Sequence, residues 1–93
     1  MKKITLFYLE TCPYCKNAYK AMEELIKENP LYGEIEVERV EESRNPELTE
    51  GYDYYYVPTM FLGTRKMYEA HPGESYEQCR ENVRRVFDGA LEA

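Results

Sequence analysis

The sequence predicts an α/β fold in which a mixed four-stranded sheet lies between two helical layers. Three observations predict it: an apolar first strand that needs cover on both faces, two amphipathic helical stretches, and short strand patterns separated by turn residues. The expected order of elements is β-α-β-(short α)-β-β-α. With 93 residues, the chain is expected to form a single domain, residues 1–93, around one core.

The first strand is expected at residues 3–9 (KITLFYL), where β-branched, aromatic and apolar residues fill nearly every position. Because neither alternating face is polar, this strand belongs at the centre of the sheet. Pro13 then fits the first turn of a helix, where the missing N–H costs nothing. A helix over residues 13–29, ended by Asn29–Pro30, follows from apolar residues at helical spacing: Cys15, Ala18, Met22, Leu25 and Ile26.

Strict alternation over residues 34–40 (EIEVERV) predicts a second, less buried strand. Ile35, Val37 and the aliphatic stem of Arg39 share one face, and Val40 lies on the other.

The stretch after the second strand predicts a short helix and a hairpin. Asn45–Pro46 suits the start of one or two helical turns that Gly51 stops. Residues 59–62 and 65–69 read as two strands joined by the Gly63–Thr64 turn.

A last helix is expected over residues 76–91. Ser75 with Gln78 three residues later matches a capping box. The helix carries an apolar stripe at helical spacing: Tyr76, Cys79, Val83, Val86, Phe87 and Ala90.

Charge and composition exclude several function classes. The chain holds 18 acidic and 12 basic residues, a net charge of −6, whereas nucleic-acid binding requires clustered Lys and Arg. No apolar run approaches the ~20 residues that cross a bilayer. The apolar run from Ile4 to Leu9 meets Glu10 without a small-residue cleavage site, which favours a strand over a signal peptide. We expect a cytoplasmic monomer that binds neither nucleic acid nor membranes.

Cys12 and Cys15 form a C-x-x-C pair where the first strand leads into the first helix. Three cysteines are too few for a disulfide-stapled secreted domain, so the pair indicates redox or metal chemistry. The positive end of the helix dipole stabilises a thiolate on Cys12, which is therefore the predicted attacking thiol. Cys15, one turn further on, faces the core and is the predicted resolving thiol.

Other roles for these cysteines are weaker. A structural zinc site needs four ligands, and only Cys79 and His71 are left to complete one, from a core helix and a loop. Haem attachment requires a histidine where Lys16 stands. Two inert cysteines remain an alternative. Cys79 lies in the apolar stripe and is expected to be a buried, unreactive thiol.

Two motifs carry a resemblance to a known family. Thr11-Cys12-Pro13-Tyr14-Cys15 after a strand, and Val57-Pro58-Thr59 before another, resemble the glutaredoxin family of the thioredoxin-fold superfamily. The resemblance implies a thioredoxin-like three-layer α/β/α fold and a glutaredoxin-like protein disulfide reductase. It also implies that Pro58 is cis and faces the cysteines, that the backbone of Val57 pairs with the substrate, and that Tyr14 is exposed and gates the site. The substrate-binding residues it implies are Pro13, Tyr14, Val57, Pro58 and Thr59.

Departures from the family pattern concern the electron donor. Members that use glutathione usually carry a basic residue at the place of Leu9 and a Gly-Gly-x-Asp-like turn at the place of residues 69–75. The apolar and acidic residues found here do not pair with the carboxylates of glutathione. Standard thioredoxins differ as well, since Thr11 stands in place of a tryptophan and Leu6 in place of a buried aspartate. A thioredoxin-reductase-like flavoenzyme or a low-molecular-weight thiol is the expected donor.

The sequence thus predicts a thiol–disulfide oxidoreductase that reduces protein or small-molecule disulfides by dithiol exchange, with no bound cofactor or metal. Disulfide-containing proteins are its expected partners. Two alternatives stay open: a redox-dependent binding module with little turnover, and a metal or iron–sulfur carrier. Four tyrosines before Pro58 either dock a polypeptide near the cysteines or divide between core and loop: Tyr52, Tyr54, Tyr55 and Tyr56.

Overall fold

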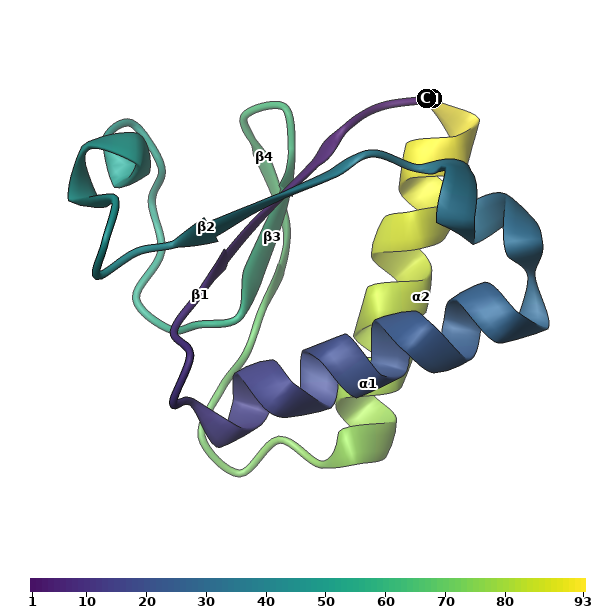
Figure 1. Cartoon of the computed structure of the whole chain (residues 1–93), viewed down its shortest axis with the longest axis horizontal. Coiled ribbons are helices and arrows are strands. Elements are labelled where there is room, and N and C mark those ends of the chain that lie inside the picture. The colour runs from purple at the N-terminus through teal and green to yellow at the C-terminus, as the bar shows by residue number, and fades with distance from the viewer.

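The computed structural model describes residues 1–93 and has the predicted order of elements (Figure 1). Its strands are β1 (Ile4–Tyr8), β2 (Val37–Glu41), β3 (Thr59–Leu62) and β4 (Arg65–Glu69). The long helices are α1 (Pro13–Glu28) and α2 (Tyr76–Glu92), and two short 3-10 helices are η1 (Pro30–Glu34) and η2 (Pro46–Thr49). No helix has the length and apolar composition to span a bilayer.

The strands form one mixed sheet in the order β2-β1-β3-β4, with β1 at its centre as predicted. β1 pairs parallel with β2 and antiparallel with β3, and β4 runs antiparallel to β3 along the edge. β2 begins at Val37 instead of residue 34, because the chain after Pro30 first makes η1. The Asn29 side chain caps that turn by accepting from the Leu31 N–H at 3.2 Å.

Both long helices cover the same face of the sheet, to the right of it in Figure 1. α2 has the predicted capping box, with both Ser75–Gln78 hydrogen bonds present. A core of 17 buried residues joins the two helices to β1 and β3, for example through Leu25, Phe87 and Met60. Ile26 was expected in this core but is 37 % exposed, since it lies at the margin of the α1 stripe, beside Gly33.

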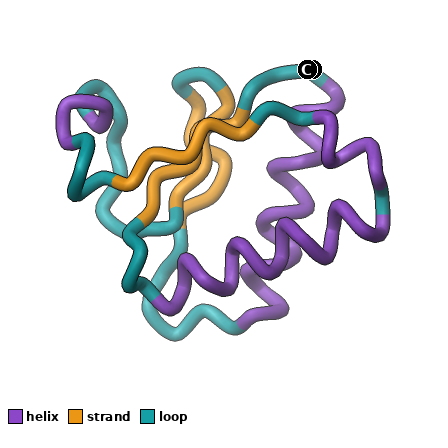
Figure 2. The backbone as a smooth tube through the Cα atoms, viewed as in Figure 1, coloured by secondary structure: helices purple, strands orange, loops and turns teal.

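The opposite face of the sheet differs from the prediction of a second helical layer. It buries Phe7, Val40 and Phe61, and the cover comes from the chain between β2 and β3, which runs to the left of the sheet in Figures 1 and 2. The short helix expected after Asn45 is only the four-residue η2, and none of its residues is buried. The cover is instead made by side chains of residues that follow η2: Tyr52, Tyr54 and Val57.

The α/β class and the mixed four-stranded sheet are confirmed, and β1 is buried on both faces, as its apolar sequence indicated. The two ends of the chain meet, because the Lys2 N–H donates to the carbonyl of Ala90 at 3.0 Å. The start of α1 lies at the opposite end of the molecule from these termini (Figure 1). The cysteine pair therefore stands where β1 and β2 end.

Candidate functional site

Cys12 is the N-cap residue of α1. A turn after β1 brings it there, with its N–H donating to the carbonyl of Leu9 at 3.2 Å. The Cys12 carbonyl accepts the first helical hydrogen bonds, from Cys15 and Lys16. Pro13 follows as an exposed first helical residue, and the first turn contains no acidic side chain. The half-buried Cys12 sulfur thus sits at the positive end of a 16-residue helix.

The Cys12 side chain meets the loop that enters β3. Its Sγ lies 3.6 Å from the carbonyl oxygen of Val57 and donates to it. The Val57–Pro58 peptide bond is cis, as the family resemblance implied. The Ala70 N–H donates to the Pro58 carbonyl at 3.0 Å and ties this loop to the end of β4. Two motifs 45 residues apart in sequence therefore share one site.

Cys15 occupies a different environment one turn into α1. Its side chain is only 1 % exposed. Burial is the main reason that the pKa of Cys15 is raised to about 12; a backbone contact with Leu9 opposes the rise, and the neighbouring Cys12 sulfur adds to it. Cys15 is therefore a protonated thiol at neutral pH. All three cysteines are free thiols in this structure.

Two of the predicted substrate-binding side chains are engaged within the protein. Tyr14 was expected to be exposed and to gate the site, but it is half-buried against the core, and its hydroxyl accepts from the Gly73 N–H at 2.8 Å. Thr59 is fully buried, and its hydroxyl donates to the Tyr68 carbonyl at 2.7 Å. Because β3 pairs on both sides, Thr59 leaves no free group for a substrate. Tyr14 instead fastens the turn before α2 to the cysteine helix.

Glu69 organises the loop before Val57, and the sequence analysis missed this role. Its Oε2 accepts from the N–H groups of Tyr55 and Tyr56 at 2.6 and 2.8 Å. Its Oε1 accepts from Lys66 at 2.7 Å. Burial alone would raise the pKa of Glu69, but the bonds from Lys66 and the two backbone amides outweigh it, so the pKa lies below its usual value of 4.5. The only available signal was a carboxylate at the end of a strand, which is too general to identify the contact.

The residues weighed for a zinc site do not come together. Cys79 is fully buried in the α2 stripe, and burial raises the pKa of its thiol. His71 is an exposed turn residue whose Nδ1 lies 3.2 Å from the Pro72 carbonyl. No group of three His, Cys, Asp or Glu side chains is arranged to hold a metal ion.

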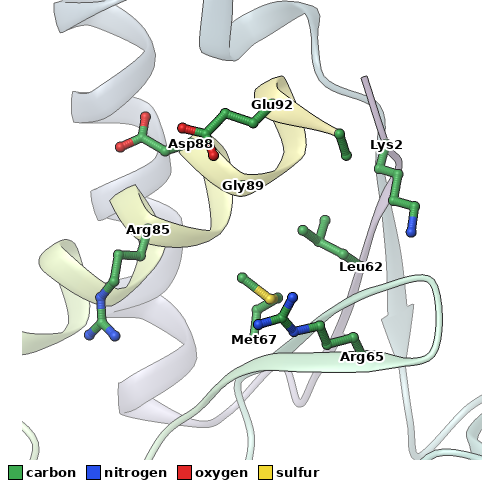
Figure 3. Close-up of a pocket in the computed structure, with 9 residues that line it drawn as sticks. Lys2, Leu62, Arg65, Met67, Arg85, Asp88, Gly89 and Glu92 are labelled. Carbon is green, nitrogen blue, oxygen red and sulfur yellow. The ribbon is translucent and has the colours of Figure 1, made fainter.

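The structure has one cavity, of about 490 Å³, at the C-terminal end of α2 (Figure 3). Leu62, Met67 and Arg65 point toward one another there, whereas Arg85 points away. No cysteine lines it, so the thiol site is open surface and not a pocket.

Comparisons with known proteins agree on the fold. The family model described as a thioredoxin domain matches residues 2–68. Thioredoxin 1 from Thermosipho africanus is 18 % identical, with a TM-score of 0.58 over 96 % of this chain and 98 % of that one. An uncharacterised thioredoxin-like protein from Clostridium perfringens is 27 % identical, with a TM-score of 0.61 over 97 % of this chain and 71 % of that one. The search of curated proteins gives no match.

Proposed function

Since the chain belongs to the thioredoxin-domain family, which supports a thiol–disulfide oxidoreductase role, we propose that it is a glutaredoxin-like reductase of disulfides that works by dithiol exchange. The observation that carries the proposal is the contrast between the two thiols. Cys12 is accessible at a helix N-terminus, and Cys15 is buried and protonated directly behind it.

The reaction proceeds in two exchanges. The Cys12 thiolate attacks one sulfur of the substrate disulfide, forms a mixed disulfide and releases the other substrate sulfur as a thiolate. Cys15 then attacks the Cys12 sulfur, its proton passes to the departing second thiol, and the protein is left with a Cys12–Cys15 disulfide. Two electrons have moved to the substrate. Because Cys15 is almost fully protonated when the protein is reduced, it does not compete with Cys12 for the substrate.

The loop at Val57 is the proposed substrate-binding edge. The backbone N–H of Val57 donates to no other group of the chain, whereas its carbonyl faces Cys12. An extended substrate segment passing over this loop can therefore pair with the Val57 backbone. Pro13 is exposed beside Cys12 and can contact such a segment, whereas the Pro58 side chain is fully buried and offers no surface to it.

Glutathione fits this surface poorly as a reductant. Leu9 offers no charge to a carboxylate, and the Gly73 N–H of the turn before α2 already donates to Tyr14. The acidic residues of that turn are also engaged, Glu69 with the Tyr55–Tyr56 backbone and Glu74 with the Tyr68 hydroxyl. A thioredoxin-reductase-like flavoenzyme, which needs only surface docking, is the proposed donor.

Reduction of insulin by the purified protein tests the proposal. Cys12→Ser should abolish turnover, and Cys15→Ser should accumulate a mixed disulfide detectable by mass spectrometry. Cys79→Ala is the matched control, since this thiol is buried away from the site, and it should retain turnover. Turnover that survives Cys12→Ser would refute the assignment.

The donor is tested by comparing re-reduction of the Cys12–Cys15 disulfide by glutathione and by a thioredoxin reductase at matched driving force. Each charge-assisted hydrogen bond to a carboxylate contributes ~1.5–3 kcal/mol, so Leu9→Lys should improve glutathione-dependent turnover roughly tenfold to a hundredfold. Fast, saturable turnover with glutathione in the unmodified protein contradicts this choice of donor.

A further inference from the structure

Tyr55 and Tyr56 are the two tyrosines of this chain whose side chains are exposed. Their exposed fractions are 88 % and 52 %, whereas the other eight tyrosines are buried or half-buried. Tyr52 and Tyr54, in the same stretch, pack their rings on Phe7 with centroids 4.8 and 5.0 Å away. The stretch thus divides into two rings that cover the sheet and two that face solvent.

The backbone under the two exposed rings is held in place. Glu69 accepts from both of their N–H groups, and Lys66 bonds both Glu69 and the carbonyl of Asp53, at 2.7 and 3.2 Å. A ring on a fixed backbone loses less conformational entropy on binding than a ring on a mobile loop. Aromatic side chains with a polar tip are also the residues most often found at the energetic centre of protein contacts.

The two exposed tyrosines directly precede the residue that contacts the reactive sulfur. Tyr56 directly precedes Val57, whose carbonyl accepts from Cys12. An extended chain advances about 3.3–3.6 Å per residue, so both tyrosines lie within two or three residue lengths of that contact. A polypeptide that pairs with the Val57 backbone while its disulfide reaches Cys12 can therefore contact them, whereas a small disulfide cannot.

Charge indicates which polypeptides suit this surface. Residues 42–56 carry one cation, Arg44, and its guanidinium already pairs with Glu10 at 2.9 Å. The same segment carries four carboxylates: Glu42, Glu47, Glu50 and Asp53. The faces of aromatic rings also attract cations. The segment is thus complementary to positive charge.

We infer that Tyr55 and Tyr56 form a docking platform for polypeptide substrates whose disulfide is flanked by basic residues. The inference rests on the proposed function and names its substrate class. Binding of the flanking residues to the rings and to the acidic segment holds the substrate disulfide at Cys12. The platform contributes nothing to the attack on a small disulfide that cannot reach it.

Single-turnover oxidation of the reduced full-length protein tests this without any electron donor. The probes are a disulfide-linked peptide with Lys beside each Cys, a matched peptide with Glu in place of Lys, and bis(hydroxyethyl) disulfide. Each rate constant is divided by that of dithiothreitol with the same probe, because dithiothreitol has no surface on which a peptide docks. The control variant is Leu31→Ser, since Leu31 is 56 % exposed but follows the far end of α1, a helix about 24 Å long.

The double variant Tyr55→Ser/Tyr56→Ser should react at least roughly tenfold more slowly with the Lys peptide, yet react with bis(hydroxyethyl) disulfide as fast as the unmodified protein. Leu31→Ser should change neither rate. The unmodified protein should prefer the Lys peptide over the Glu peptide, and added salt should reduce this preference. Equal losses on the Lys peptide and on bis(hydroxyethyl) disulfide, no loss on either, or a preference for the Glu peptide overturns the inference and leaves the reductase function standing. Failure of the unmodified protein to react with any disulfide overturns the reductase function itself.

Discussion

The two faces of the sheet are covered in different ways. On one face two long helices bury a continuous core that includes Leu25, Val83 and Phe87. On the other face three buried residues lie beneath a stretch that is mostly loop. Apart from Cys12 and Pro13, the residues proposed to receive substrate come from the loop side: Tyr55, Tyr56 and Val57. In this fold the face covered by the helices supplies most of the stability, and the face covered by the loop supplies the binding surface.

The helices and the loop that cover the sheet also differ in how their backbone N–H groups are hydrogen-bonded. A helix pairs its own N–H and carbonyl groups, whereas the loop makes only a few backbone hydrogen bonds and is held in addition by two carboxylates from the sheet. Glu41 accepts from the N–H groups of Ser43 and Glu10, and Glu69 accepts from those of Tyr55 and Tyr56. The shape of the loop therefore depends on ionised side chains, which the helical layer does not need.

The largest expected effect is on the helical face. Phe87 is fully buried, and its ring lies 5.1 Å from that of Tyr32. Phe87→Ala removes the ring and leaves a cavity, so the free energy of unfolding should fall by about 3–5 kcal/mol. Urea denaturation followed by circular dichroism measures this. A loss under about 1 kcal/mol would show that the helical face is not the main source of stability.

A smaller effect is expected from the equivalent change on the loop face. Tyr52 contacts Phe7 and Phe61 with ring centroids 4.8 Å away, but it is only half-buried. Tyr52→Ala should cost about 1–2 kcal/mol of unfolding free energy, because part of the ring is already in water. Tyr56→Ala, an exposed ring in the same stretch, is the control and should cost under about 0.5 kcal/mol. If Tyr52→Ala costs as much as Phe87→Ala, the two covers are equivalent and the contrast between them fails.

Removing the Tyr54 hydroxyl, on the loop face, should lower the free energy of unfolding by less than Phe87→Ala or Tyr52→Ala. The Tyr54 hydroxyl donates to Glu42 Oε2 at 2.6 Å, and the half-buried Glu42 can be rehydrated when the bond is lost. Tyr54→Phe should therefore lower the unfolding free energy by about 1 kcal/mol. Tyr55→Phe removes a hydroxyl with no partner in the chain and should leave stability unchanged. Equal effects of the two substitutions would contradict a role for the Tyr54–Glu42 bond.

Local patterns predicted the helical face well. The α2 stripe and its capping box are properties of residues three or four apart, and the α1 stripe failed only at Ile26. The position of the C-x-x-C pair at the start of the first helix and the cis proline were also predicted, the latter from the family resemblance. The contacts of the loop face were not predicted, because they join distant residues of no regular spacing; only the division of the four tyrosines between core and loop was among the alternatives, and it is confirmed. Tyr54 packs on Phe7, Glu69 binds the Tyr55 backbone, and nothing in the sequence around any of these residues indicates its partner.

Because Glu41 and Glu69 help to hold the loop, its order should depend on pH. The Ser43 hydroxyl bond lowers the pKa of Glu41 below 4.5, with burial opposing and backbone N–H groups assisting. Glu69 also has a lowered pKa, because its bonds from Lys66 and the Tyr55–Tyr56 amides outweigh its burial. A carboxylate whose pKa is lower in the folded state adds stability that is fully present well above its unfolded value of 4.5. That stability is lost as the pH falls through the folded value.

Acid should therefore loosen the loop before it affects the helices. Between pH 7 and about pH 3.5, hydrogen-exchange protection factors should fall at the Tyr55 and Tyr56 amides while those of Val83 and Val86 in α2 hold. Glu69→Gln is the matched variant, because it keeps the size of the side chain and removes the ionisable acceptor. Its Tyr55 and Tyr56 amides should already be less protected at pH 7, and the part of their pH dependence that Glu69 causes should be absent. A simultaneous loss of protection in the loop and in α2 of the unmodified protein would contradict this prediction. It would show that Glu41 and Glu69 do not stabilise the loop independently of the helices, so that the two faces of the sheet respond to acid in the same way.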